Sequence, residues 1–314
     1  MLKLIGRRIL ALIPLLFMVS LIVFLLVSII PGDPAVTLAG ENASESRIAT
    51  IRETLGLNDS LISQYWAFIS RVVTLDLGTS LFSSSEVFEL IRQRAPATIS
   101  LTLGALVFAI VVGIPAGLIA GARQGKPADR IVMLGATSGV ALPSYFLAIL
   151  FILFFAVRNS WFPATGYVPP ERGYVEWLKS IALPAVALGT NGAALIARQL
   201  RSSLVDVLQQ DYIRTARAKG LRGRSVVLKH AFKNSAAPMV TVLGIQVAYL
   251  LGGTVVIEYI FGIAGLGQLA YSAVIQKDVP LIQGIVMVMA LAVVAVNLLI
   301  DVTYAYLDPK VRSR

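Results

Sequence analysis

Few residues in this chain have side chains suited to chemistry. The 314-residue sequence contains no cysteine, which excludes a disulfide framework, a thiolate nucleophile and a cysteine-ligated metal. Its one histidine, His230, lies in a basic loop and cannot form a metal site or serve as the base of an intramembrane serine protease. We therefore predict that the chain is not an enzyme and binds no metal or cofactor of its own.

Two glycine-containing segments fail as nucleotide-binding motifs. Gly121 to Pro127 has one residue too few between its glycines, and Pro127 stands where a P-loop requires Ser or Thr. Gly262, Gly265 and Gly267 lack the strand, turn and helix of a dinucleotide site. If ATP drives this protein, we expect ATP and magnesium to bind to separate ATPase chains.

The most informative polar segment is a loop at residues 198–233, which carries nine Lys and Arg residues. Asp211 is expected to cap a helix of about two turns that runs from Tyr212 to Lys219, and Gly220 is expected to end it in the left-handed conformation. Ser225 is expected to cap the following helix. The loop therefore contains an independent short helix.

This short helix should need a partner, because a helix of two turns is marginal in isolation. Asp211 and Lys219 suit its dipole. Ala216 and Ala218 have small side chains, which suit insertion into a groove of another protein. The residues assigned to such a contact are Asp211, Tyr212, Arg214, Thr215, Ala216, Arg217, Ala218, Lys219 and Gly220.

The elements that position this loop are predicted to be membrane helices. The composition is 57% hydrophobic and only 14% charged, with a mean hydropathy of +0.79, which excludes a water-soluble or disordered protein. Six stretches of at least 18 residues lack Asp, Glu, Lys and Arg, namely Ile9–Gly32, Ala95–Ala122, Ile131–Val157, Ser180–Ala197, Asn234–Ile257 and Val279–Ile300. The fourth contains Pro184 and should be kinked or packed against other helices. Because none contains an ionisable residue, ion-coupled transport is disfavoured.

The basic residues set the orientation of these stretches. With the N-terminus in the cytoplasm, 18 of the 27 Lys and Arg residues and only five of the 17 Asp and Glu residues lie inside. Both termini are therefore expected to be cytoplasmic. The basic residues responsible for the net charge of +10 are concentrated in the segments predicted to be cytoplasmic. The charge therefore reflects membrane orientation, and we expect no nucleic-acid partner. Arg7 and Arg8 before the first stretch also allow a signal peptide, but its 22-residue run lacks a small-x-small site and favours a retained span.

The segment after the first stretch is predicted to form short external helices. An apolar stripe with helical spacing comprises Ile62, Tyr65, Trp66, Ile69, Val72 and Val73. Ser83 and Glu86 have capping-box spacing before Val87. These helices would form either a structural cap or a docking platform for another protein.

The loop sequence from Asp211 to Leu221, with Lys229 to Asn234 and Pro238 after it, resembles the cytoplasmic loop of binding-protein-dependent ABC transporter permeases of the dipeptide/oligopeptide/nickel branch. The wider family has Glu-Ala-Ala and a later glycine where this chain has Arg214, Thr215 and Ala216, then Gly220. Further segments similar to this branch occur in order along the chain, at Arg7–Arg8, Pro31–Pro34, Leu55–Leu57, Asp76–Ser80, Phe261–Gly267 and Leu307–Arg312.

The resemblance implies an all-α integral membrane protein with six transmembrane helices and an ABC type I importer permease fold in the bacterial plasma (inner) membrane. It implies a first helix with an external segment at residues 1–97, a five-helix transport core at 98–308 that contains the 198–233 loop, and a tail at 309–314. The implied function is half of the translocation pathway of an ATP-driven importer of short peptides, with glutathione, nickel chelates or opine-like solutes as alternatives.

The implied partners are a second permease subunit, two ATPase subunits, an external substrate-binding protein and membrane lipid. The competing function is a channel or facilitator that needs no ATPase, which the lack of intramembrane charge permits. We further expect the segment Glu258–Lys277, with Gly262, Gly265 and Gly267, to form a re-entrant turn and helix that gates the external mouth of the path.

Overall fold

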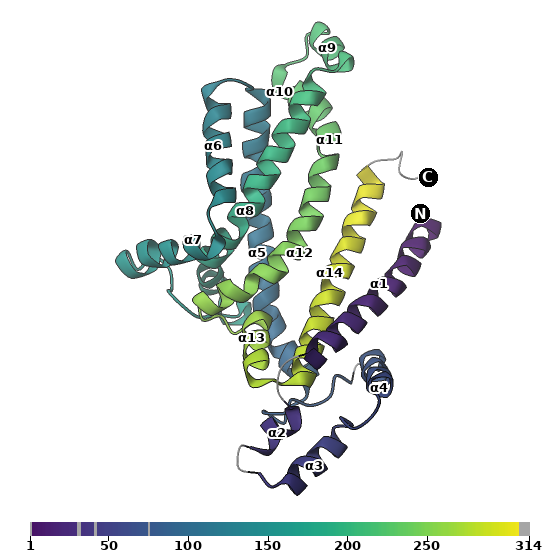
Figure 1. Cartoon of the computed structure of the whole chain (residues 1–314). Coiled ribbons are helices and arrows are strands. Elements are labelled where there is room, and N and C mark those ends of the chain that lie inside the picture. The colour runs from purple at the N-terminus through teal and green to yellow at the C-terminus, as the bar shows by residue number, and fades with distance from the viewer. Residues whose placement is uncertain (1, 30–32, 41–42, 75, 308–314) are drawn as a thin grey trace. The chain divides into compact units, whose positions relative to one another are not determined.

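A computed structural model describes residues 2–29, 33–40, 43–74 and 76–307. Within these ranges the chain is helical, and extended pairing is limited to an isolated bridge between Thr79 and Glu86. The α-helices are α1 (Leu2–Ile29), α2 (Pro34–Ala39), α3 (Glu45–Thr54), α4 (Leu61–Val73), α5 (Val87–Ala122), α6 (Pro127–Ala141), α7 (Ser144–Phe151), α8 (Tyr174–Leu208), α9 (Asp211–Ala218), α10 (Gly223–Ser225), α11 (Phe232–Ser235), α12 (Ala237–Ile260), α13 (Leu266–Gln276) and α14 (Val279–Leu307) (Figure 1). Two π-helical segments, η1 (Ile152–Arg158) and η3 (Val226–Ala231), and a 3₁₀ turn, η2 (Pro170–Arg172), complete the set.

Four of the described helices are long and apolar enough to cross a membrane: Val87–Ala122, Tyr174–Leu208, Pro238–Ile260 and Val279–Ile300. The predicted third span is not one straight helix, because α6 and the α7–η1 pair meet at an angle of 100°. The break lies at Pro143, which cannot continue the backbone hydrogen bonding of α6. If this bent pair counts as one span, the described chain has five.

The predicted first span forms a helix, α1, which contains the apolar stretch Leu12–Leu25. The predicted end of this span, at Pro31 and Gly32, lies outside the described residues. The total of six spans therefore stays a prediction.

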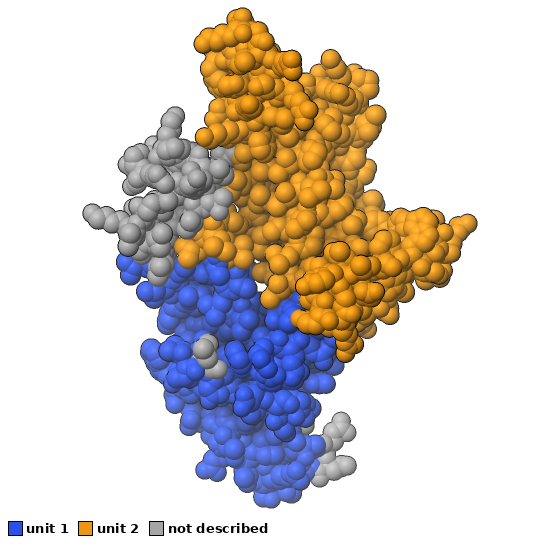
Figure 2. Space-filling view, turned by 180° about the vertical axis from the view of Figure 1, so that it is seen from behind, with its two compact units in different colours: residues 1–96, 264–295 blue, residues 97–263, 296–314 orange. Residues whose placement is uncertain are grey.

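The chain divides into two compact units, which Figure 2 shows in blue and orange. Unit 1 comprises residues 1–96 and 264–295, and unit 2 comprises residues 97–263 and 296–314. The division assigns the external segment and α13 to unit 1, and the 198–233 loop to unit 2.

Unit 1 contains the predicted external helices. In α4, Tyr65 and Phe68 are buried against Val23 and Phe24 of α1, whereas Trp66 is largely exposed. Only one side of α4 is therefore buried, and part of the predicted apolar stripe remains exposed. The predicted capping box is not used, because the Ser83 hydroxyl accepts a hydrogen bond from the Ser85 N–H instead.

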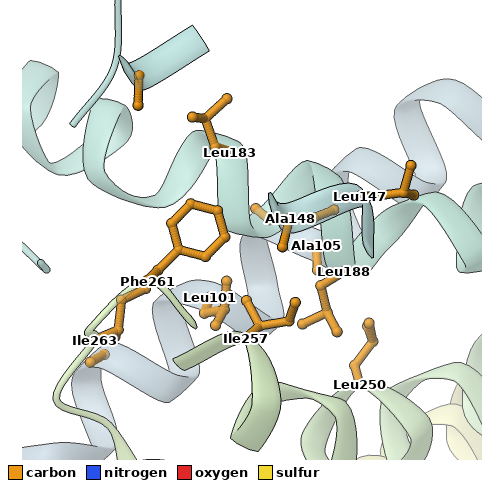
Figure 3. Close-up of a cluster of buried hydrophobic side chains, with 14 residues drawn as sticks. Leu101, Ala105, Leu147, Ala148, Leu183, Leu188, Leu250, Ile257, Phe261 and Ile263 are labelled. Atoms are coloured by element: carbon orange, nitrogen blue, oxygen red, sulfur yellow. The ribbon is translucent and has the colours of Figure 1, made fainter. Parts of the chain in front are cut away.

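Unit 2 is built around α8, which packs against α6, α7 and α12. In its most apolar stretch 72% of the residues are buried, against 28% in α5, which confirms that this helix packs against protein. Leu188 of α8, Leu101 of α5 and Leu250 of α12 belong to the main apolar cluster, in which Ile257 lies between Leu101 and Leu188 (Figure 3). Phe261, at the end of α12, closes the same cluster.

A row of three glycines brings α5 and α8 into close contact. Gly113, Gly117 and Gly121 recur every fourth residue on α5 and therefore share one face. A Cβ atom at Gly113 would lie 2.7 Å from the carbonyl oxygen of Ala193, and one at Gly117 would lie 2.9 Å from that of Ala197. Only glycine permits this backbone approach, a packing mode common between membrane helices. Gly121 faces Leu204, so the row of close contacts extends along α8 into the first part of the basic loop.

Candidate functional site

The candidate site is the helix α9 and the residues that hold it. Its N-cap is Gln210 rather than the predicted Asp211, and Asp211 is the first helical residue. The Asp211 carboxylate still lies in the first turn, where it favours the positive end of the helix dipole. Gln210 has extended backbone and its side chain makes no capping hydrogen bond.

The C-terminus of α9 confirms the predicted role of Gly220. Its φ is +77°, in the left-handed region that only glycine adopts without strain. The Leu221 N–H donates to the Ala216 carbonyl at 3.3 Å, and the Gly220 N–H donates to the Arg217 carbonyl at 2.9 Å. These two bonds form a Schellman motif, which ends the helix and turns the chain.

One face of α9 is anchored to its own chain. Ile213 is fully buried and Ala216 is 8% exposed, and both pack with Leu204 of α8 and with Val226 and Ala231 of η3. The expectation that Ala216 presents a small surface to another protein is therefore wrong. Its small side chain instead lets α9 lie close to the rest of unit 2.

The remaining predicted residues of this segment are exposed, namely Asp211, Tyr212, Arg214, Thr215, Arg217, Ala218 and Lys219. The Arg214 guanidinium lies 3.3 Å from the Asp211 carboxylate, but both groups are solvent-exposed, so this pair contributes little stability. The face that could meet another molecule is thus predominantly cationic.

A second contact ties α9 to the helix that follows. The Asn234 side-chain amide donates to the Tyr212 hydroxyl at 2.8 Å. Asn234 belongs to α11, which leads directly into α12. The turn between them contains no cap at Ser225, since α10 already begins at Gly223 and continues as the π-helical η3. Each side of α9 is therefore linked to a long apolar helix, α8 before it and α12 after it.

The three glycines proposed for the external gate fall in different elements. Gly262 follows α12 with a φ of +57°, Gly265 is the N-cap of α13, and Gly267 is buried inside α13. The expected turn followed by a short helix is present. The chain passes from unit 2 to unit 1 within this segment, between Ile263 and Ala264.

Comparison with known proteins identifies the family. A family model described as the binding-protein-dependent transport system inner membrane component matches residues 113–313, and the N-terminal model of the same system matches residues 1–102. The chain belongs to this family. It is accordingly a multi-pass permease of the bacterial inner membrane.

Relatives match this permease over its whole length. The glutathione transport system permease protein GsiC of Escherichia coli (strain K12) is 40% identical over 314 residues, which is 100% of both chains. A Brucella abortus (strain 2308) protein named as a peptide transport system permease is 40% identical over 312 residues, 99% of each chain. Among solved structures, an inward-facing form of the MetNI methionine ABC transporter superposes with a TM-score of 0.57 at 20% identity, covering 70% of this chain and 96% of that chain. This likeness concerns the fold.

Sequence reasoning missed the buried carboxylates of this permease. Asp129, near the start of α6, accepts hydrogen bonds from Arg201 of α8, and Glu258 of α12 is fully buried and accepts one from the Thr98 hydroxyl at 2.6 Å. Glu258 was placed outside the fifth span, but the apolar helix extends past it to Ile260. No spacing rule pairs residues so far apart in sequence, so only the fold identifies these contacts.

A third buried carboxylate organises unit 1. Asp278 accepts hydrogen bonds from the Ser80 hydroxyl and the Leu81 N–H, and it also caps α14 through the Leu281 N–H. The segment between α4 and α5 is thereby joined to the turn between α13 and α14. Within the described ranges no group of three or more His, Cys, Asp or Glu residues could hold a metal ion.

Proposed function

We propose that this permease is one subunit of an ATP-driven ABC importer and forms half of its translocation pathway. In this assignment it crosses the membrane six times with both termini in the cytoplasm. The assembly contains a second, homologous permease chain, two ATPase subunits that bind ATP and magnesium, and an external substrate-binding protein. Full-length similarity to permeases of the glutathione and peptide systems supports this assignment.

The proposed substrate is a short peptide or a related small solute such as glutathione. This choice follows the names of the relatives, which share 40% of their residues with this chain. Selectivity would reside mainly in the binding protein, which delivers the solute to the permease.

The observation that carries the coupling proposal is the two-sided character of α9. Ile213 and Ala216 hold its inner face, whereas Arg214, Arg217 and Lys219 remain exposed on the outside. A helix fixed in this way can move as one piece with α8 and α12 when another protein pushes on its exposed face. We assign this exposed face as the surface that receives the ATPase subunit.

The experiment is co-purification of the ATPase subunits with the permease from membranes, followed by substrate-stimulated ATP hydrolysis. Arg214→Glu combined with Arg217→Glu should abolish association, because it reverses the charge of the exposed face without touching Ile213. The control combines Lys126→Glu with Arg222→Glu, two exposed cations outside α9, and should retain the ATPase. Full association of the α9 variant would refute the assignment.

The alternative function is an ATP-independent channel or facilitator. A facilitator should retain no ATPase after detergent extraction, and the purified chain alone should equilibrate a peptide across vesicles. Accumulation against a gradient only when ATP and the ATPase chains are present would exclude this alternative.

A further inference from the structure

Beside α9, unit 2 has a groove of about 630 Å³, within the ~300–1,000 Å³ range of ligand sites. Its apolar wall comes from the last turns of α5, with Leu118 and Ile119, and from η3, with Val227 and Leu228. Ile119 and Leu228 are nearly half exposed, so the apolar surface is open to a ligand. This wall of the groove suits an apolar group.

Three arginines border the same groove, and no acidic residue lines it. They come from three separate elements: Arg123 follows α5, Arg217 belongs to α9 and Arg224 belongs to α10. All three are exposed, and none forms an ion pair with another part of the described chain. Their charges are therefore available to an anionic group, and guanidinium groups bind phosphate oxygens well.

The groove lies where an apolar helix leaves the membrane. The apolar span α5 ends at Ala122, one residue before Arg123, and Leu118 and Ile119 form the preceding turn. An apolar wall followed directly by cationic groups matches the transition from acyl chain to headgroup in a lipid leaflet. Basic pockets of this kind at the membrane boundary recognise anionic headgroups.

We propose that this groove binds one anionic phospholipid, with an acyl chain along Leu118, Ile119 and Leu228 and the phosphate between Arg123, Arg217 and Arg224. Because Arg217 is part of α9, the bound lipid would fill the space between α9 and the end of α5. Arg217 also belongs to the face assigned to the ATPase subunit, so the test uses the permease chain without ATPase, and a failure of lipid binding is distinct from a failure of ATPase association.

The test uses the full chain purified in detergent, stripped of lipid and titrated with dioleoyl phosphatidylglycerol while bound lipid is counted by native mass spectrometry. Dioleoyl phosphatidylcholine, with the same chains and no net charge, is the lipid control. Wild type should bind one phosphatidylglycerol at least ten-fold more tightly than phosphatidylcholine. The variant with Arg123→Gln, Arg217→Gln and Arg224→Gln should lose this preference.

The matched control carries Arg130→Gln, Arg198→Gln and Arg222→Gln, three exposed arginines that do not line the groove. It has the same net charge as the groove variant and should bind phosphatidylglycerol as wild type does. Leu228→Trp retains every arginine but fills the apolar wall, so it should also weaken binding. Circular dichroism checks that each variant is folded.

Three outcomes would overturn the proposal. Equal loss in the groove variant and the matched control would indicate unspecific attraction to the surface charge. Equal affinity of wild type for the two lipids would show that the arginines do not recognise the anionic headgroup. Cross-linking of a cysteine at Leu228 to a second permease or an ATPase chain, rather than to a photoreactive phosphatidylglycerol, would assign the groove to a protein.

Discussion

The Arg201 guanidinium donates two hydrogen bonds of 2.8 Å to the Asp129 carboxylate, one to each carboxylate oxygen, although the two residues are 72 positions apart in the sequence. The Gly125 N–H adds a third bond to the same carboxylate at 2.9 Å. Asp129 lies just inside α6, and Arg201 lies on the part of α8 that leads to α9. The pair therefore fixes the turn between α5 and α6 against the helix that leads to α9.

Asp129→Asn should lower the melting temperature of the detergent-purified permease by several degrees. The Asp129 side chain is only 5% exposed, and removal of one partner from a buried pair costs roughly 3 to 5 kcal/mol. The partial exposure of Arg201 should bring the loss toward the lower end of this range. Arg214→Gln, which breaks the exposed pair with Asp211, serves as the control and should change stability by less than about 1 kcal/mol. Equal shifts for the two variants would contradict a structural role of the Asp129 pair.

Gly117→Leu should destabilise the permease because it forces α5 away from α8. A Cβ atom at this position would already lie 2.9 Å from the Ala197 carbonyl oxygen, and overpacking costs about 1 to 3 kcal/mol or more. Gly135→Leu on α6 is the matched control, because a Cβ atom there meets nothing within 4 Å. Expression level and thermal stability in detergent measure both effects. If Gly117→Leu is as stable as Gly135→Leu, the close approach of the two helices is incorrect.

Gly220→Val should impair ATPase association or substrate-stimulated turnover while membrane insertion stays normal. A β-branched residue at a φ of +77° is strained, and the strain would disrupt the end of α9 although the space around Gly220 is open. Gly220→Asn should retain most activity, because asparagine tolerates the left-handed conformation. Gly166→Val is the control, because it places the same side chain at another positive φ, +95°, at a position distant from α9 in the sequence. It tests whether backbone strain at any site is enough to cause the coupling defect. If Gly220→Val retains wild-type ATPase association and substrate-stimulated turnover, α9 does not couple the permease to the ATPase.

Single cysteines at Ser60 and Ser202 should report opposite sides of the membrane, since the natural chain has no cysteine. Both serines are exposed in the structure and can react without unfolding. With an impermeant thiol reagent, Ser60→Cys should label on intact cells and Ser202→Cys only after permeabilisation. Equal labelling of intact cells would contradict the proposed orientation.

Gly265→Leu should lower transport or uncouple ATP hydrolysis from it, without loss of expression or ATPase binding. Gly265 occupies the N-cap of α13, a position that leucine fills poorly, so the turn after α12 should be displaced. Gly265→Ala, which adds only a methyl group, should cause a smaller defect. Transport and ATP hydrolysis measured together in reconstituted vesicles test this prediction. Unchanged coupling in Gly265→Leu would indicate that the segment between α12 and α13 is a loop without a gating role.

Local signals in the sequence were sufficient for the main helices and for the end of α9. The long apolar runs predict membrane helices because uncharged side chains and internally bonded backbone are required in lipid. The positive φ of Gly220 was also predictable, since the residue that ends a helix in the left-handed conformation is usually glycine. In contrast, composition could not reveal the bend of 100° between α6 and α7 or identify Gln210 as the N-cap. Both depend on backbone geometry set by neighbouring elements.

The sequence by itself determined that this protein is a helical membrane permease and that its basic loop holds a separate short helix. Only the tertiary structure decided which face of that helix is free. Ala216 has the small side chain that suits either a foreign groove or a close internal contact, and its burial with Ile213 and Leu204 selects the internal one. Periodicity describes one helix at a time, whereas the partners of Asp129, Glu258 and Asp278 come from distant parts of the chain. Such contacts exist because packing brings those helices together, and this packing is not encoded in any local pattern.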